Sequence, residues 1–213
     1  ELISNASDAM DRARFESVTD GKQASETPYQ ITLIPNQEAK TLTITDNGIG
    51  MTAKEVEENI GTVASSGTKK FLQAMKERAD APELIGQFGV GFYAAFMVAE
   101  KVEMVTRRRG EQTVSWVSDG KGNYDIGVGA DDAQPGTTIT LHLREGMDEY
   151  LDAWRIREIV RRYSDYIAYP VVLCPDPSVK KDDKDEKDGD EESKEPQTIN
   201  SMKAIWKRGK DEV

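Results

Sequence analysis

The sequence predicts an α+β fold, a two-layer sandwich in which a mostly antiparallel, mixed sheet carries helices on one face. The main observation is a run of four β-rich segments, at 101–107, 112–118, 122–127 and 137–143, with no helical segment between them. Strands that follow one another in this way pair antiparallel. Helical patterns occur before and after this run without a regular β-α-β succession. The helices are therefore expected to form a layer against the sheet.

The first helix is expected from residue 1 to about 20, where a glycine at 21 supplies a stop. At 100° per residue its apolar side chains form one stripe and its small polar side chains a second. A third stripe, at i, i+4, i+7 and i+11, consists of Glu1, Asn5, Asp8 and Arg12. Its carboxylate and amide, one turn apart, suit a proton acceptor and a metal ligand in a cleft. Taken alone, the stripe favours a solvated side face.

A hairpin and a capped helix are expected next. Residues 29–34 and 40–46 are β-rich and partly alternating, and the short polar connection between them is typical of a hairpin. Thr52 and Glu55 have the spacing of a capping box, in which each residue satisfies a backbone N–H group of the other. This pattern predicts a helix over 53–60.

In the middle and at the end of the chain we expect one mobile segment and several regular ones. The stretch 61–68 is small and polar with little to anchor it, so it is a candidate mobile lid. A helix is expected over 69–79, and the glycine-rich turn 86–91 should lead directly into an apolar helix. A longer helix is expected over 148–166, followed by a short strand at 171–173.

Composition limits the classes of partner. The 213 residues carry a formal charge of −11, which argues against sequence-independent nucleic-acid binding because such binding needs a basic face. A phosphate ligand would then be held by backbone N–H groups, helix N-termini or a metal ion. The one cysteine, Cys174, permits no internal disulfide and indicates a reducing compartment. No apolar run approaches the roughly 20 residues of a membrane span.

We expect a single folded domain at 1–176, a charged flexible linker at 177–197 and the start of a further domain at 198–213. The core of the linker, 180–195, carries nine acidic and five basic residues without an aliphatic or aromatic one, so it cannot build a core. We also expect the natural chain to begin before Glu1, because the helical pattern is already running there without a cap.

Two glycine-containing motifs suggest a ligand site. Asp46 ends a predicted strand and opens D-N-G-I-G, where Gly48 and Gly50 would let a flat ligand approach the backbone while the carboxylate accepts from an exocyclic amine. DNG by itself is also a common turn. The GxxGxG run 86–91 at a helix start would bind an anion, but its order is not the GxGxxG of dinucleotide folds. The segment 61–69 fails the phosphate-loop pattern on spacing.

The remaining candidate side chains are more simply structural. His142 alternates with leucines on a predicted strand and lacks partner ligands, so it is expected to be a structural or surface histidine. Cys174 is expected to be a buried thiol. Trp116 and Trp154 are expected in the core, since basic residues do not interleave with them as in a stacking platform.

Read together, five motifs resemble the nucleotide-binding domain of the heat-shock protein 90 chaperones. They are ELISNASDA, DNGIGM, GTVASSGT, IGQFGVGFY and GTTITLHL, in this order. The resemblance covers residues 1–176 and extends to the linker. It implies a Bergerat-type fold with an ATP lid, in the superfamily that also includes type II topoisomerases, mismatch-repair ATPases and histidine kinases.

At the base of the nucleotide, the resemblance implies that Asp46 accepts from the adenine amine. Gly50 and Thr137 would help through backbone and bridging water, and Met51 would pack on the base. Asn59 would lie near the sugar and phosphates.

At the phosphates, the resemblance implies that Glu1 is the general base that activates the attacking water. Asn5 would ligate magnesium through its amide oxygen, and Asp8 would line the same pocket. The residues expected to contact the phosphates from the lid and from the glycine turn are Ser66, Gly67, Gly86, Gln87, Phe88, Gly89, Val90, Gly91 and Phe92.

For the whole protein, the resemblance implies a cytoplasmic, homodimeric stress-response chaperone. It would bind ATP or ADP with Mg²⁺, hydrolyse ATP very slowly in this fragment, and act on unfolded client proteins without nucleic-acid or membrane partners. One departure is Ser65, where the family often has a lysine. A topoisomerase or mismatch-repair ATPase, a histidine kinase catalytic domain and a non-enzymatic nucleotide-gated interaction domain stay open as alternatives.

Overall fold

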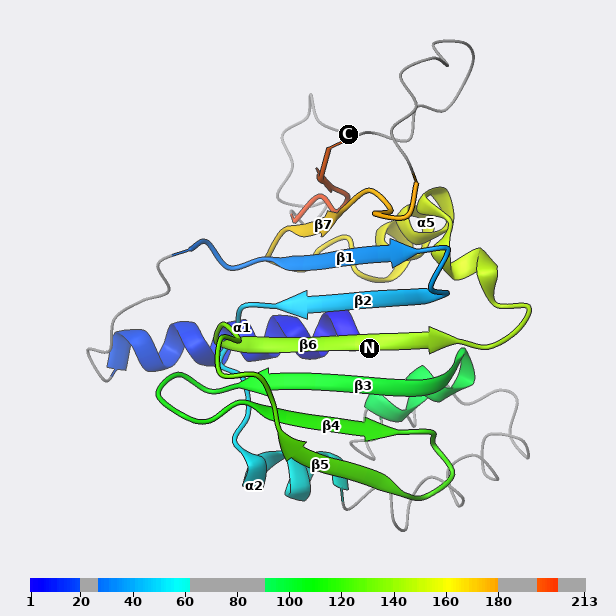
Figure 1. The fold of residues 1–213 in the computed structure, drawn as a ribbon. Coiled ribbons are helices and arrows are strands. Elements are labelled where there is room, and N and C mark those ends of the chain that lie inside the picture. The colour runs from blue at the N-terminus through cyan, green and yellow to red at the C-terminus, as the bar shows by residue number, and fades with distance from the viewer. Residues whose placement is uncertain (20–26, 62–90, 180–194, 203–213) are drawn as a thin grey trace, which may run out of the picture.

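A computed structural model describes residues 1–19, 27–61, 91–179 and 195–202. Its centre is one eight-stranded sheet with the order β5-β4-β3-β6-β2-β1-β7-β8. Every neighbouring pair is antiparallel except β1 and β7, which are parallel, and helices lie on one face of the sheet (Figure 1). The predicted α+β class with a mostly antiparallel, mixed sheet is thus confirmed. The strands are β1 (Ile31–Asn36), β2 (Thr41–Asp46), β3 (Ala99–Arg107), β4 (Val114–Ser118), β5 (Tyr124–Val128), β6 (Gly136–Leu143), β7 (Val171–Leu173) and β8 (Gln197–Thr198).

Strand register brings three polar side chains together at one end of the sheet. Asp46 in β2 lies opposite Thr137 in β6, and Thr137 lies opposite Thr106 in β3. All three are buried, although their strands otherwise send Ile44, Ile139 and other apolar side chains to the same core. Alternation along a strand puts these residues on the helix-covered face. A buried polar group of this kind needs internal partners or a ligand.

Helix α1 (Leu2–Thr19) packs its apolar stripe on the sheet, as predicted. Met10 is fully buried and Ala6 nearly so. The loop after β2 lies directly on this helix, because Ile49 N donates to Ala9 O at 3.1 Å. At Gly48 a Cβ atom would lie 2.8 Å from the Ala9 carbonyl carbon, so only glycine permits this approach. The helix is thereby fixed against the end of β2.

Three predicted helices differ in form from the expectation. The capping box of Thr52 and Glu55 is present and starts α2 (Ala53–Val56), but the helix continues as a π-helical turn, η1 (Glu57–Gly61). The apolar segment after the glycine turn is a 3₁₀ helix, η2 (Gly91–Met97), and not an α-helix. The last helix is divided into η3 (Asp148–Leu151) and α5 (Ala153–Tyr163).

The division of the last helix has a local cause. Asp152 has an extended backbone and caps α5, because its carboxylate accepts from Arg155 N at 2.8 Å. An aspartate is a better helix cap than an interior helical residue, so the chain restarts the helix there.

The two tryptophan predictions had opposite outcomes. Trp116 on β4 has no exposed surface and is core, as predicted, whereas Trp154 on α5 is 66% exposed, so that prediction was wrong. Ile156 and Val160 form the buried face of this helix, and Trp154, two residues before Ile156, points about 200° away from it. Basic residues do follow Trp154 along α5, at positions 155, 157, 161 and 162.

The chain on the far side of the charged run returns to the sheet. Residues of β8 pair with β7, and Ile199 and Asn200 are buried. The Asn200 side chain accepts from Val171 N at 2.8 Å. The predicted division into 1–176, 177–197 and 198–213 stays a prediction, since 180–194 and 203–213 lie outside the described residues. Within the described part of the chain, no helix has the length and apolar character to cross a bilayer.

Candidate active site

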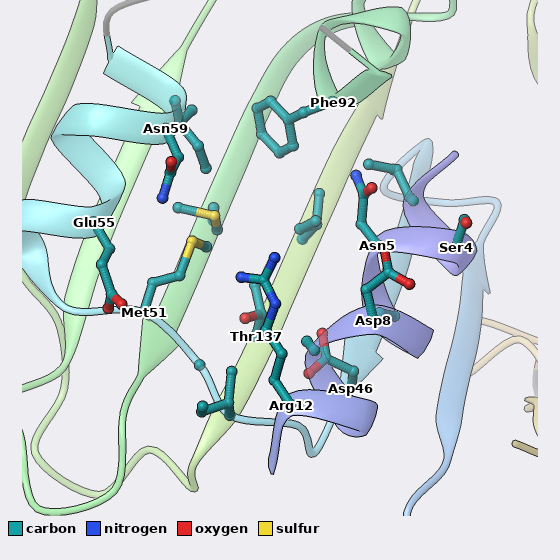
Figure 2. Close-up of a pocket in the computed structure, with 18 of the residues that line it drawn as sticks. Ser4, Asn5, Asp8, Arg12, Asp46, Met51, Glu55, Asn59, Phe92 and Thr137 are labelled. Carbon is teal, nitrogen blue, oxygen red and sulfur yellow. The ribbon is translucent and has the colours of Figure 1, made fainter. Parts of the chain in front are cut away.

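A cavity of about 1180 Å³ lies between α1, the β2–α2 loop, α2 and the buried end of the sheet (Figure 2). The structure brings residues from five separate parts of the chain to its walls. Those among the predicted site residues are Glu1, Asn5, Asp8, Asp46, Gly50, Met51, Asn59, Gly91, Phe92 and Thr137. Ser66, Gly67 and the predicted glycine-turn residues 86–90 lie outside the described residues, as do the predicted lid from 62 onwards and the helix over 69–79.

The third stripe of α1 is a wall of this cavity and not a solvated side face. Glu1, Asn5, Asp8 and Arg12 all line it, and Figure 2 shows the last three on the helix side facing Met51 and Asn59. All four residues are solvent-exposed, so their side chains are accessible to a ligand in the cavity. The helix thus presents two carboxylates, one amide and one guanidinium along a single line.

One end of α1 meets the start of η2. A Cβ atom on Gly91 would lie 2.3 Å from Glu1 Oε2, so the carboxylate rests directly against this glycine. Phe92, the next residue, is half-buried and packs edge-on against Trp116 and Tyr93. The Tyr93 hydroxyl donates to Ile60 O and so joins η2 to the end of η1. At this end of the cavity, Glu1 directly before α1 meets Gly91 at the start of η2.

Asp46 lies at the floor of the cavity and is only 7% exposed. Burial raises the pKa of its carboxyl from 3.8 to about 6, although hydrogen bonds from the backbone of Gly48 and Thr137 pull the pKa down. The Gly48 N–H group donates to Asp46 Oδ1 at 2.9 Å. A buried carboxylate with an oxygen facing a cavity is a strong acceptor for a ligand N–H group.

Thr106 supports the same floor, and sequence reasoning missed it. Thr106 is only 1% exposed, and its hydroxyl accepts from Met51 N at 2.9 Å and lies 3.0 Å from the Thr137 hydroxyl. It also donates to Gly136 O at 3.1 Å. The only signal that could have found it is strand register, because Thr106 pairs with Thr137 from a strand 31 residues away.

Gly50 brings the loop close to β3. Its φ is +67°, and a Cβ atom there would lie 2.0 Å from Arg107 O. Both conditions restrict this position to glycine. The backbone at Gly50 is therefore held between the cavity and the end of β3.

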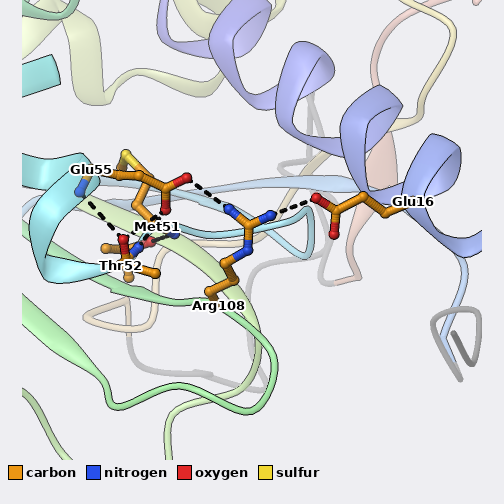
Figure 3. Close-up of polar contacts among 6 residues, drawn as sticks. Glu16, Met51, Thr52, Glu55 and Arg108 are labelled. Carbon is orange, nitrogen blue, oxygen red and sulfur yellow. Dashed lines mark hydrogen bonds and ion pairs between the residues drawn. The ribbon is translucent and has the colours of Figure 1, made fainter. Parts of the chain in front are cut away.

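Arg108 forms the rim of the cavity opposite Glu1 and was also missed. Its guanidinium bonds Glu16 of α1 at 2.5 Å and Glu55 of α2 at 2.7 Å (Figure 3). Glu55 in turn accepts from Thr52 N at 2.8 Å and from the Thr52 hydroxyl at 2.9 Å. Burial opposes ionisation of Glu55, but the bonds from Thr52 and Arg108 outweigh it and lower the pKa.

His142 and Cys174, which were predicted to be structural, agree with that prediction in part. His142 lies between buried leucines on the opposite face of β6, with Nε2 3.4 Å from Glu103 Oε1. Cys174 is half-buried rather than fully buried, and burial raises the pKa of its thiol. Neither lines the cavity.

Comparisons with known proteins agree along the whole chain. Residues 1–123 match the family described as histidine kinase-, DNA gyrase B- and HSP90-like ATPase, and residues 149–212 match the family described as Hsp90 protein. The chaperone protein HtpG of Geobacter sulfurreducens is 54% identical over 100% of this chain and 34% of its own length. The HtpG proteins of Nitrosospira multiformis and Streptomyces coelicolor are each 47% identical over 100% of this chain, and over 33% and 34% of their own lengths.

This chain spans about one third of the length of these curated relatives. The family match covers more than half of the chain and includes α1, the Asp46 loop and η2. The chain therefore belongs to the histidine kinase-, DNA gyrase B- and HSP90-like ATPases, and within them to the Hsp90 family.

Proposed function

We propose that this chain is the ATP-binding and ATP-hydrolysing module of a dimeric molecular chaperone, in which the nucleotide state drives lid closure and client folding. Family membership and the relatives named chaperones support this proposal. The observation that carries it is the convergence of three side chains on one cavity, with Glu1 and Asn5 at the N-terminal end of α1 and Asp46 at the floor. The proposal includes a cytoplasmic, stress-responsive homodimer without nucleic-acid or membrane partners.

The base of the nucleotide is proposed to lie over Asp46. The carboxylate would accept from the exocyclic amine of adenine, and its burial makes it selective for a donor. Gly50 and Thr137 border the same floor, and Met51 offers an apolar side chain to the base. A guanine would present an oxygen to the carboxylate, so the site should prefer ATP over GTP.

The phosphates are proposed to lie toward Glu1, Asn5 and Gly91. Glu1 would act as general base for the attacking water, and Asp8 and Asn59 would line the sugar and phosphate path. The Asn5 amide oxygen fits Mg²⁺, which commonly takes few protein ligands and completes its shell with water and phosphate oxygens. This agrees with the absence of any cluster of three or more acidic, histidine or cysteine ligands among the described residues. Bound Mg²⁺ would neutralise phosphate charge.

We further propose that Ser66, Gly67 and residues 86–90 contact the phosphates when a nucleotide is bound. This part of the proposal rests on the sequence motif, which the family match covers.

Nucleotide titration tests the proposal. The chain should bind ATP and ADP with Mg²⁺ more tightly than GTP. Asp46→Asn should abolish binding, because the asparagine amide would place an N–H donor against the exocyclic amine of adenine, which is also a donor. Glu1→Ala should keep ATP affinity and, in a protein that also carries the remainder of its relatives' length, reduce turnover by roughly 10²–10⁴. Glu145→Ala, an exposed acid outside the cavity, is the control.

Failure of the wild-type chain to bind adenine nucleotides would refute the proposal, and unchanged turnover in Glu1→Ala would remove that residue from its role. DNA-stimulated hydrolysis would favour the topoisomerase or mismatch-repair alternative. Phosphate transfer to a histidine domain would favour the kinase alternative. The match of residues 149–212 to Hsp90 supports the chaperone over both.

A further inference from the structure

We propose that Arg108 is a positioning residue for nucleotide binding. Its ion pairs with Glu16 and Glu55, called here the Glu16–Arg108–Glu55 clamp, hold α2 at a fixed distance from α1 and so set the width of the cavity at its base end. The inference rests on the proposed nucleotide site. It adds a residue that contacts neither reacting atoms nor, in this structure, the Asp46 floor.

The clamp joins three elements that are distant in sequence. Glu16 lies in the last turns of α1, Arg108 directly follows β3, and Glu55 is in the first turn of α2. All three side chains line the cavity. Figure 3 shows the guanidinium between the two carboxylates, with one nitrogen directed to each. A planar fork of this kind can bond two carboxylates at once, which an ammonium group does less well.

The clamp connects to the base end of the cavity through Thr52. Glu55 holds Thr52 by two hydrogen bonds, and Thr52 directly follows Met51. Met51 N is held from the other side by the Thr106 hydroxyl. The start of α2 is therefore fixed by the sheet at Met51 and by the rim at Glu55. A shift of α2 would move Met51 and, further along the same helical segment, Asn59.

Loss of the cation would leave two carboxylates on opposite sides of the rim. Glu16 and Glu55 would then repel each other instead of sharing Arg108, which favours a wider cavity. The capping box between Thr52 and Glu55 does not involve Arg108, so α2 itself should stay helical. The side chains of the clamp are 29–36% exposed, and partly exposed ion pairs have modest strength. The effect on affinity should be moderate and salt-dependent.

Affinity measurements on Arg108→Gln test this inference, with ADP and adenosine as ligands and calorimetry as the readout. A positioning role at the base end predicts that both ligands bind about three- to tenfold more weakly, by the same factor, because both contain the base. Raising the salt concentration should bring wild-type affinity toward that of the variant. Arg109→Gln, the adjacent exposed arginine, should bind both ligands like the wild type.

Two further variants separate positioning from a structural role. Arg108→Lys keeps the charge but not the fork, so it should have intermediate affinity. Glu16→Gln should weaken binding in the wild-type background but cause no further loss in Arg108→Gln, because the ion pair is already absent there and the substitution removes the repulsion between the two carboxylates. Thermal unfolding without ligand should be nearly unchanged in these variants.

Unchanged affinity of Arg108→Gln for both ligands would overturn the inference while leaving the proposed function intact. A loss for ADP alone would overturn it as well, because it would indicate direct phosphate contact. Fully additive effects of Glu16→Gln and Arg108→Gln would show that they do not act through one clamp. A wild-type chain that binds neither ligand would contradict both the inference and the proposed function.

Discussion

Replacing Asp46 by asparagine should stabilise the ligand-free protein while destroying its ligand site. Burial raises the pKa of Asp46 from 3.8 to about 6, so the folded protein holds a proton that the unfolded chain releases between these pH values. The free energy of unfolding therefore falls as pH rises from 3.8 to about 6, and it stays lower above that. Because the pKa of Asp46 is about 2 higher in the folded state, burying its carboxylate lowers the free energy of unfolding by roughly 3 kcal/mol at neutral pH.

Asparagine has a similar shape, can still accept from Gly48 N and carries no charge to bury. Asp46→Asn should therefore raise the unfolding free energy by up to about 3 kcal/mol at pH 7.5, and the gain should disappear near pH 4. Urea unfolding without nucleotide, followed by the fluorescence of buried Trp116, measures this difference across pH.

Asp176→Asn provides a control of opposite sign. Burial opposes ionisation of Asp176, but its bonds from Ser178 and Gln37 N lower the pKa overall, so its carboxylate stabilises the fold above pH 4. Removing that charge should lower stability at neutral pH. An Asp46→Asn protein that is no more stable than wild type at pH 7.5, or whose gain does not vary with pH, would refute the reasoning about Asp46.

Three other substitutions test the packing around the site by urea unfolding. Thr106→Val should lower the free energy of unfolding by about 1–3 kcal/mol, because Met51 N loses its buried acceptor. Thr106→Ser keeps the hydroxyl and should lower it less. Equal losses in the two variants would exclude the hydroxyl as the cause. Gly50→Ala should cost at least about 1–3 kcal/mol, since its φ is +67° and Arg107 O is too close; a neutral effect would contradict this geometry. Trp154→Ala should change stability by less than about 0.5 kcal/mol, whereas Trp116→Ala should cost about 3–5, so equal effects would contradict their burial.

Local pattern was sufficient for most of the fold, and it aligned the side chains of one wall of the site, although taken alone it favoured a solvated face for them. The α1 stripe of Glu1, Asn5, Asp8 and Arg12 is a consequence of helical periodicity alone, and the structure places it in the cavity. The capping box was predictable because both of its bonds form within four residues. The antiparallel sheet followed from strands that succeed one another without helices.

The residues that sequence reasoning missed depend on contacts between distant segments. Thr106 matters because β3 and β6 pair in a register that puts it beside Thr137 and Met51. Arg108 matters because the end of β3 lies between α1 and α2. In sequence it is only one of three successive arginines. The error at Trp154 has a related origin. Burial was predicted because the residue is a tryptophan, but its position around the helix axis puts it on the exposed face of α5.

The departures from ordinary folding preference cluster at the floor of the cavity. Asp46 is a carboxyl group whose charge is disfavoured by burial, and Gly50 and Gly136 both have positive φ angles that exclude most side chains. A Cβ on Gly136 would lie 2.1 Å from Asp46 O, and one on Gly50 would lie 2.0 Å from Arg107 O. These glycines therefore let two backbone segments close around one buried acid. Positions that exclude most side chains and a buried carboxylate thus occur together where a ligand would bind.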